Sequence, residues 1–215
     1  MAFNPSMPYA RPNRDACLDW LQMLSGAALV LFMACHTLLV SSVIISPGLM
    51  NAIAGFFEAT YMAQVGGPLI FLVFIGHFIL AARKIPFTAD GQEIAWAHAR
   101  MLRHPNTWLW IAQVLTAMIV LFLGAIHMWV VLNDLPIEAA KSAARVRSGG
   151  WQWFYFILLP VIQLHVFIGV YRIGVKWGFI TRENRDKAQK IVLGMFCGFM
   201  LIGVITSLAL ANMAL

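Results

Sequence analysis

Residues 29–45 read LVLFMACHTLLVSSVII, and this apolar run with His36 near its centre decides how the rest of the chain is interpreted. The run carries no charged side chain, and about 20 such residues in a helix cross the hydrocarbon core of a bilayer. An imidazole in apolar surroundings must form a hydrogen bond, bind a ligand or cost free energy. The stretch therefore predicts a membrane-spanning helix whose histidine has a specific role.

The composition of the whole chain indicates the same environment. Of its 215 residues, 61% are hydrophobic and only 11% are charged, which is typical of a bilayer protein and unlike a soluble domain. Further apolar runs of spanning length bring the expected helices to 20–45, 63–85, 107–132, 151–176 and 190–213. The connectors are short and contain no repeat. We expect an all-α fold, a single domain over 1–215 that forms an integral membrane bundle of five transmembrane helices.

The distribution of lysine and arginine predicts the orientation of these helices. Three basic residues fall on one side of the expected bundle, namely Lys141, Arg145 and Arg147. Twelve fall on the other side, namely Arg11, Arg14, Arg83, Lys84, Arg100, Arg103, Arg172, Lys176, Arg182, Arg185, Lys187 and Lys190. Because cytoplasmic loops are enriched in these residues, we expect a cytoplasmic N-terminus. The basic face suits an acidic partner or anionic lipid, and nothing indicates nucleic acid.

Histidines occur in four of the five expected spans. By depth, His36 and His127 fall in the outer half of the bilayer, and His77 and His165 in the cytoplasmic half. A single intramembrane histidine most often forms only an interhelical hydrogen bond, but four of them weaken that interpretation. Two per layer, each from a different helix, are what two bis-histidine haems require. Haems with no vacant coordination position predict electron transfer, and no CxxCH motif is present to attach them covalently.

The two propionates of a haem need cationic or hydrogen-bonding partners near the membrane surface. The candidates are Gln22, Ser25, Trp110, Arg145 and Lys176. Lys176 has an equally good alternative role as a cationic anchor at the cytoplasmic boundary.

Four segments carry a resemblance to a known family: FMACH at 32–36, LRHPNTWLW at 102–110, LGAIH at 123–127 and LHVFIGVYRIGVKWG at 164–178. Together with the five spans, they resemble the dihaem cytochrome b membrane-anchor subunit of the succinate dehydrogenase and fumarate reductase family, of the menaquinol:fumarate reductase type. The resemblance covers nearly the whole chain. It implies that His36 pairs with His127 at a distal haem and His77 with His165 at a proximal haem.

The resemblance also implies partners and a reaction. A flavoprotein subunit and an iron-sulfur subunit would bind on the cytoplasmic side of a bacterial inner membrane. Menaquinol would be oxidised near the distal haem, and fumarate would be reduced to succinate on another subunit. Gly194 and Gly198 form a GxxxG pair in the last span, which packs the bundle or a second protomer of a homodimer.

Quinol oxidation releases two protons, so the outer side of the site needs a proton acceptor. Glu58 is the only carboxylate in the first outer connector, and it resembles the quinol-site glutamate of the family. The alternative is a solvated loop acid. One departure concerns Gln163, two residues before His165, where a well-known member of the family has a carboxylate implicated in moving protons across the membrane. An amide cannot exchange protons in that way.

Four alternatives remain open at this point. A succinate:menaquinone reductase anchor would run the same reaction in reverse. A hydrogenase or formate dehydrogenase cytochrome b also uses histidines on several helices. Purely structural haems would leave quinone chemistry elsewhere. A histidine-lined metal transporter would favour acidic residues beside the histidines within the spans, and this sequence has none there.

Overall fold

The computed structural model describes residues 14–214, and these residues contain helices and connecting turns but no β-strand. The five helices long and apolar enough to cross a membrane cover Arg14–Ile44, Met62–Ala82, Pro105–Leu132, Trp151–Lys176 and Arg185–Asn212. They are built from α1 (Arg14–Ser41), α3 (Gly67–Ala82), α5 (Pro105–Leu132), α7 (Trp151–Lys176) and α8 (Arg185–Asn212). Short 3₁₀ (Ser42–Ile44) and π (Met62–Gly66) segments extend α1 and precede α3. The prediction of an all-α bundle with five transmembrane helices is confirmed.

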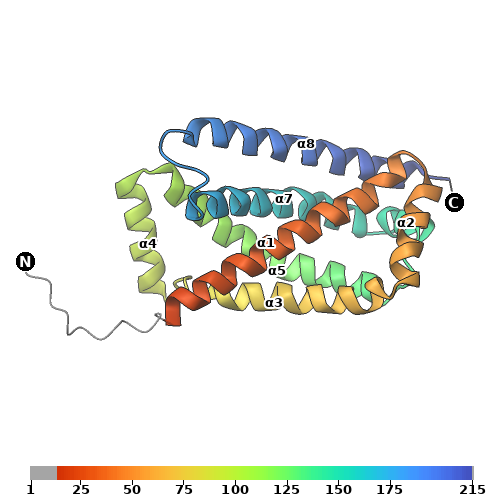
Figure 1. The fold of residues 1–215 in the computed structure, drawn as a ribbon, viewed down its shortest axis with the longest axis horizontal. Helices are drawn as coiled ribbons and strands as arrows, with labels where there is room; N and C mark the ends of the chain where they lie inside the picture. Colours follow the sequence, from red (N-terminus) through yellow and green to blue (C-terminus); the bar gives the residue numbers. More distant parts are fainter. Residues whose placement is uncertain (1–13, 215) are drawn as a thin grey trace, which may run out of the picture.

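The five long helices run along the same axis, with α1 crossing the others obliquely (Figure 1). Three shorter helices lie in the connectors: α2 (Pro47–Ala59), α4 (Ala89–Leu102) and α6 (Ala139–Arg147). In Figure 1, α4 lies across one end of the bundle and α2 across the other. We call these the α4 end and the α2 end. Because the long helices alternate in direction, α1, α5 and α8 start at the α4 end.

The outward faces of the spans carry a large apolar surface that suits lipid. Leu38 and Leu72 are 71% and 68% exposed, and Leu31 and Phe122 are exposed to a similar degree. Apolar exposure of this extent over many side chains marks a surface that meets a partner or a membrane. Helices satisfy their backbone hydrogen bonds internally, so they tolerate such an environment. The chain is a multi-pass integral membrane protein.

The three connector helices are a difference from the sequence analysis, which treated these segments as plain connectors. Capping explains two of them. Ser46 accepts a hydrogen bond from the Leu49 N–H and is followed by Pro47 at the first helical position of α2. Thr88 accepts from the Gly91 N–H at the start of α4. Both arrangements satisfy backbone donors that a helix N-terminus leaves free.

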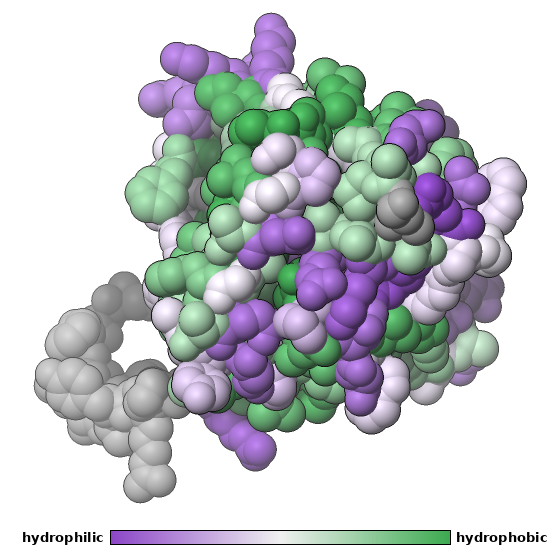
Figure 2. Space-filling view, turned by 90° about the vertical axis from the view of Figure 1, so that its right-hand side faces the viewer, coloured by the Kyte–Doolittle hydropathy of each residue, from purple (hydrophilic) through white to green (hydrophobic). Residues whose placement is uncertain are grey.

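The close-packed core of the molecule lies at the α2 end. It is a cluster of small and medium apolar side chains from the 3₁₀ extension of α1 and from α2, α6 and α8, formed by Val43, Met50, Ala139, Ala143, Val146 and Leu210. The surface of this end carries a band of hydrophilic side chains between hydrophobic ones (Figure 2), and Asn51, Glu138 and Arg147 are exposed there. In contrast, α3 has no buried residue at all. The cluster at the α2 end thus draws on α2, α6 and α8, whereas α3 contributes no fully buried residue.

The glycines of α8 divide into two groups by their surroundings. A Cβ atom at Gly203 would lie 2.6 Å from Leu159 Cδ1 of α7, which is too close for any real contact. A Cβ atom at Gly194 or Gly198 would meet nothing within 4 Å. Gly203 thus permits close packing of α8 on α7, whereas the GxxxG pair faces away from the described part of the chain.

A histidine-lined cavity along the bundle

A cavity of about 1330 Å³ runs through the bundle. Its lining includes Asp19 and Lys84 at the α4 end and Asp134 and Lys141 at the α2 end. Protein interiors are close-packed and contain few voids larger than a water molecule. A small-molecule site usually measures about 300–1,000 Å³, so this volume exceeds what one such ligand needs. The cavity is therefore large enough for a bound group bigger than a typical small-molecule ligand.

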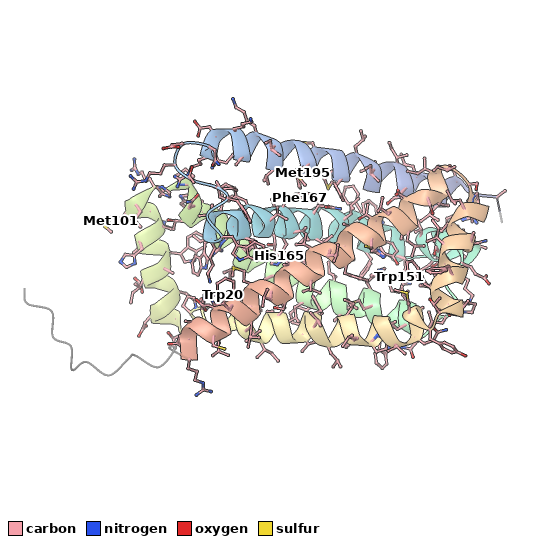
Figure 3. All side chains as sticks on the ribbon, in the orientation of Figure 1. Trp20, Met101, Trp151, His165, Phe167 and Met195 are labelled. Atoms are coloured by element: carbon pink, nitrogen blue, oxygen red, sulfur yellow. The ribbon has the colours of Figure 1, made fainter. Side chains whose placement is uncertain are left out.

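All four intramembrane histidines line this one cavity. The rings of His36 (α1) and His127 (α5) have centroids 6.0 Å apart and planes inclined at 72°. His77 and His165 come from α3 and α7. Figure 3 shows His165 near the middle of the bundle, whereas Trp151 marks the α2 end of the same helix. The structure thus brings the four predicted residues together around a common space.

The histidine geometry fits the haem that the sequence predicts. A metal–imidazole bond measures about 2 Å, so two rings bound to one metal ion have centroids about 6 Å apart, as His36 and His127 do. Within residues 14–214, no group of three or more His, Cys, Asp or Glu side chains is placed to hold a metal ion. Pairs of histidines without further protein ligands suit a porphyrin, which supplies the other four nitrogens itself.

Three of the four rings have a hydroxyl group beside their Nδ1 atom. The Nδ1 of His77 lies 2.9 Å from Ser25 Oγ, and the Nδ1 of His165 lies 3.1 Å from Thr116 Oγ1. The Nδ1 of His127 lies 3.4 Å from the Tyr155 hydroxyl. Ordering the second nitrogen of a metal-binding histidine in this way is a recurrent feature of metal sites.

His36 differs from the other three histidines. Its ring stacks on Phe32 one turn earlier in α1, with centroids 5.8 Å apart. The described residues provide no hydrogen bond to this ring. Apolar stacking rather than hydrogen bonding therefore orients His36.

The propionate candidates lie at both ends of the cavity. Gln22, Trp110 and Lys176 line it towards the α4 end, and Arg145 lines it towards the α2 end. The Gln22 Oε1 atom is buried without a hydrogen-bond partner in the described part of the chain. Ser25 is absent from the described lining and instead contacts His77. The propionate roles stay predictions.

Two of these candidates already pair with carboxylates. Lys176 Nζ lies 3.7 Å from Asp19, which also binds Arg83 at 3.0 Å and Lys84 at 2.8 Å. The Lys176 side chain is half-exposed, so this pair contributes little stability and leaves the ammonium free to bind elsewhere. At the opposite end, the more buried Arg145 donates to Asp134.

Glu58 lies near the C-terminal end of α2 and is half-buried. Its Oε2 accepts a hydrogen bond from Gln64 Nε2 at 2.5 Å, and its Oε1 accepts one from the Ile137 N–H at 3.3 Å. Ile137 itself lines the cavity. The neighbouring Asp134 differs because it forms ion pairs with Arg145 and with Lys141, the latter at 3.4 Å. Among the described residues, the hydrogen-bond donors to Glu58 are thus neutral. Glu58 lies next to the lining residue Phe57 and contacts the lining residue Ile137, but it is not itself part of the lining.

Sequence reasoning missed the residues that contact the histidines from other helices. Thr116 is buried in α5, and Tyr155 lies in α7. The available signal was a hydroxyl within an apolar span, but the partner lies 49 positions away along the chain for Thr116 and 28 positions away for Tyr155. Gln163 is only 4% exposed and lines the cavity, so the amide that departs from the family pattern occupies an interior position.

Comparisons with known proteins identify similar chains. Residues 90–206 match the family model described as succinate dehydrogenase/fumarate reductase transmembrane subunit. A fumarate reductase cytochrome b subunit of Helicobacter pylori is 34% identical over 200 residues, which are 89% of this chain and 78% of that protein. The protein of the same name from Wolinella succinogenes is 30% identical over 209 residues, which are 91% of this chain and 82% of that one.

Proposed function

Since this chain belongs to the succinate dehydrogenase/fumarate reductase transmembrane subunit family, we propose that it is the dihaem subunit that oxidises menaquinol for a fumarate reductase. Its relatives are the cytochrome b subunits of such enzymes. The chain is accordingly a cytochrome b membrane subunit of a fumarate reductase complex. The proposal extends this to the number of haems, their ligands and the quinol chemistry.

The observation that carries the proposal is the cavity lined by four histidines from four helices. His36 and His127 would hold one haem, and His77 and His165 the other. Bound there, the haems supply carriers of single electrons in the two halves of the bilayer. The surrounding apolar side chains exclude water. Gln22, Trp110, Lys176 and Arg145 line the two ends of the cavity, where charged propionates require polar partners.

Glu58 is proposed as the proton acceptor for quinol oxidation. A general base must lie within reach of the proton that it accepts and be free to accept it. Both oxygens of Glu58 are bound by uncharged donors, so taking up a proton breaks no ion pair. Asp134 at the same end would lose its pairing with Arg145 and Lys141. This contrast supports Glu58 as the acceptor.

The orientation of the complex follows from charge. The basic residues gather at the α4 end, and the α2 end has only Lys141, Arg145 and Arg147 among the described residues. By the positive-inside rule, the α4 end is proposed to face the cytoplasm. The flavoprotein and iron-sulfur subunits would bind there, and menaquinol would be oxidised at the α2 end.

A haem count on the purified complex tests the proposal. A dithionite-reduced minus oxidised pyridine haemochrome spectrum should give about two b-type haems per copy of this chain. Flavin, iron-sulfur clusters and fumarate reductase activity should purify with it. A hydrogenase or formate dehydrogenase cytochrome b would not purify together with fumarate reductase activity. A preparation without haem would overturn the proposal and favour the metal-transport alternative.

A further inference from the structure

We propose that Ser25 and Thr116 are positioning residues that fix which nitrogen of His77 and His165 carries the proton, so that each ring presents an unprotonated Nε2 to the cavity. This inference rests on the haem-binding function proposed above and deepens it. It assigns a role to two hydroxyl groups that bind the rings from outside the cavity.

The geometry is the same at both histidines. Ser25 on α1 contacts the Nδ1 of His77 on α3 at 2.9 Å. Thr116 on α5 contacts the Nδ1 of His165 on α7 at 3.1 Å. In each case, the hydroxyl comes from a neighbouring helix rather than from the turn next to the histidine. The two contacts thus hold two pairs of helices together at the inner histidines.

Each hydroxyl also forms a hydrogen bond to a backbone carbonyl. This bond determines whether the hydroxyl donates to the histidine or accepts from it. The Ser25 hydroxyl donates to the Gln22 carbonyl oxygen at 3.0 Å, and the Thr116 hydroxyl donates to the Ala112 carbonyl oxygen at 2.7 Å. A carbonyl oxygen can only accept, and a hydroxyl group has only one proton to donate. With that proton used, each hydroxyl oxygen is left to accept a hydrogen bond from the histidine.

The histidine must therefore donate through Nδ1–H. A neutral imidazole carries one proton, so a protonated Nδ1 leaves the lone pair on Nε2. A bound haem iron would take that lone pair as its ligand. The hydroxyl groups thus select the form of each ring that can act as an axial ligand, and the hydrogen bond from Nδ1 increases the electron donation of the ring to a bound metal.

Close packing around the rings supports the arrangement. A Cβ atom at Gly26 would lie 2.9 Å from His77 Cε1, so glycine permits α1 to approach near enough for the Ser25 contact. On the other side, Gln113 Nε2 donates to the His165 carbonyl oxygen at 3.2 Å. Gln113 and Thr116 lie one turn apart on α5, and together they hold both the backbone and the ring of His165.

Within residues 14–214, the outer histidines, His36 and His127, lack a hydroxyl that also donates to a backbone carbonyl, so they provide a comparison within the same chain. The contact between His127 and Tyr155 is longer, at 3.4 Å. Among the described residues, the Tyr155 hydroxyl donates to no backbone carbonyl, and His36 has only its stacking on Phe32. Neither outer ring is thus held in one form as the inner rings are.

The test compares Thr116→Val, which removes the hydroxyl with little change in volume, with Thr116→Ser, which keeps it. Each variant is purified as the whole complex, and its haems are followed by redox titration and by low-temperature electron paramagnetic resonance of the oxidised form. Thr116→Val should raise the midpoint potential of one haem and shift its resonance, because the ring donates less electron density. Thr116→Ser should match the wild type. Ser25→Ala should move the same haem, and the other haem should stay unchanged.

The possible results separate this inference from the proposed function. One result is a wild type that contains two haems whose midpoint potentials and resonances are the same in Thr116→Val and Ser25→Ala. In that case the positioning role is wrong and the haem function stands. Equal shifts of both haems would likewise overturn it, since they indicate a general disturbance of the bundle. A wild type without haem would overturn the proposed function itself. If Thr116→Val loses its haem outright, the redox titration of Ser25→Ala tests the inference instead. A raised midpoint potential of one haem supports the positioning role, and unchanged potentials overturn it.

Discussion

The imidazole rings of His36 and His127 lie with their centroids 6.0 Å apart, one from α1 and the other from α5. The two residues belong to separate apolar spans, and each would be an unfavourable intrusion of a polar group on its own. Both rings line the same cavity, and their separation is compatible with the binding of one metal ion proposed above.

We expect His36→Ala to lose about one of the two haems. His127→Ala should lose the same haem, because both rings would bind the same iron, and combining the two substitutions should cost no more than either alone. The haem content per chain, measured from the pyridine haemochrome spectrum, checks this. His98→Ala is the matched control, since His98 lies exposed on α4. Two haems retained in His36→Ala would contradict the assignment.

We expect Glu58→Gln to lower the turnover of menaquinol by about 10²-fold or more, which is the usual contribution of a general base. The amide keeps a carbonyl oxygen for the Ile137 N–H, so the loop should stay in place. The measurement is fumarate reduction driven by a menaquinol analogue, compared with reduction driven by a soluble dye that needs no quinol site.

The control for this prediction is Glu138→Gln. Glu138 lies at the same end of the bundle and lines the cavity, but it is exposed and its side chain makes no capping hydrogen bond to α6. It should keep wild-type activity with both donors. An active Glu58→Gln enzyme would show that another group accepts the protons.

We expect Lys176→Gln to lower the midpoint potential of the inner haem. Removing a positive charge beside a propionate stabilises the oxidised, more positive form of the haem. Asp19 keeps Arg83 and Lys84, so the local structure should persist. Redox titration measures the shift, and Lys187→Gln is the control because Lys187 is exposed and is not part of the described cavity lining. Identical titrations of the two variants would argue for a purely topological role of Lys176.

We expect Gly203→Val to destabilise the bundle by about 1–3 kcal/mol, the usual cost of overpacking. Its side chain would collide with Leu159 of α7. Gly198→Val adds the same atoms where a Cβ meets nothing, so the fold of the single chain should tolerate it. The fraction of complex that retains haem after heating in detergent compares the two. Equal heat sensitivity would contradict the packing argument.

The sequence was sufficient to predict the architecture because the bilayer imposes one strong rule, namely spans of about 20 apolar residues. The five helices lie where such runs occur. Depth along these runs also grouped the histidines into two layers, since rise per residue converts position into height. The structure gives the separation of one of these pairs directly.

The missing parts depend on contacts between distant segments. The partners Ser25–His77 and Thr116–His165 are 52 and 49 positions apart, and no local pattern relates them. The helices α2 and α6 lie in short connectors without a spanning apolar run, so a prediction based on the length of apolar runs did not include them. Ser46 followed by Pro47 was the signal for α2, because that pair starts helices.

The histidine-lined cavity has a consequence for how the protein is made. Because α3 has no fully buried residue and lines the cavity through Phe74 and His77, the bundle would gain part of its cohesion from the haem proposed to bind there. A ligand that binds only the folded form stabilises that form in proportion to its supply. Haem delivery would then act as a checkpoint in biogenesis. Chains inserted while haem is scarce would remain loosely assembled and exposed to membrane proteases, so the cell's haem supply would set how much of the respiratory complex accumulates.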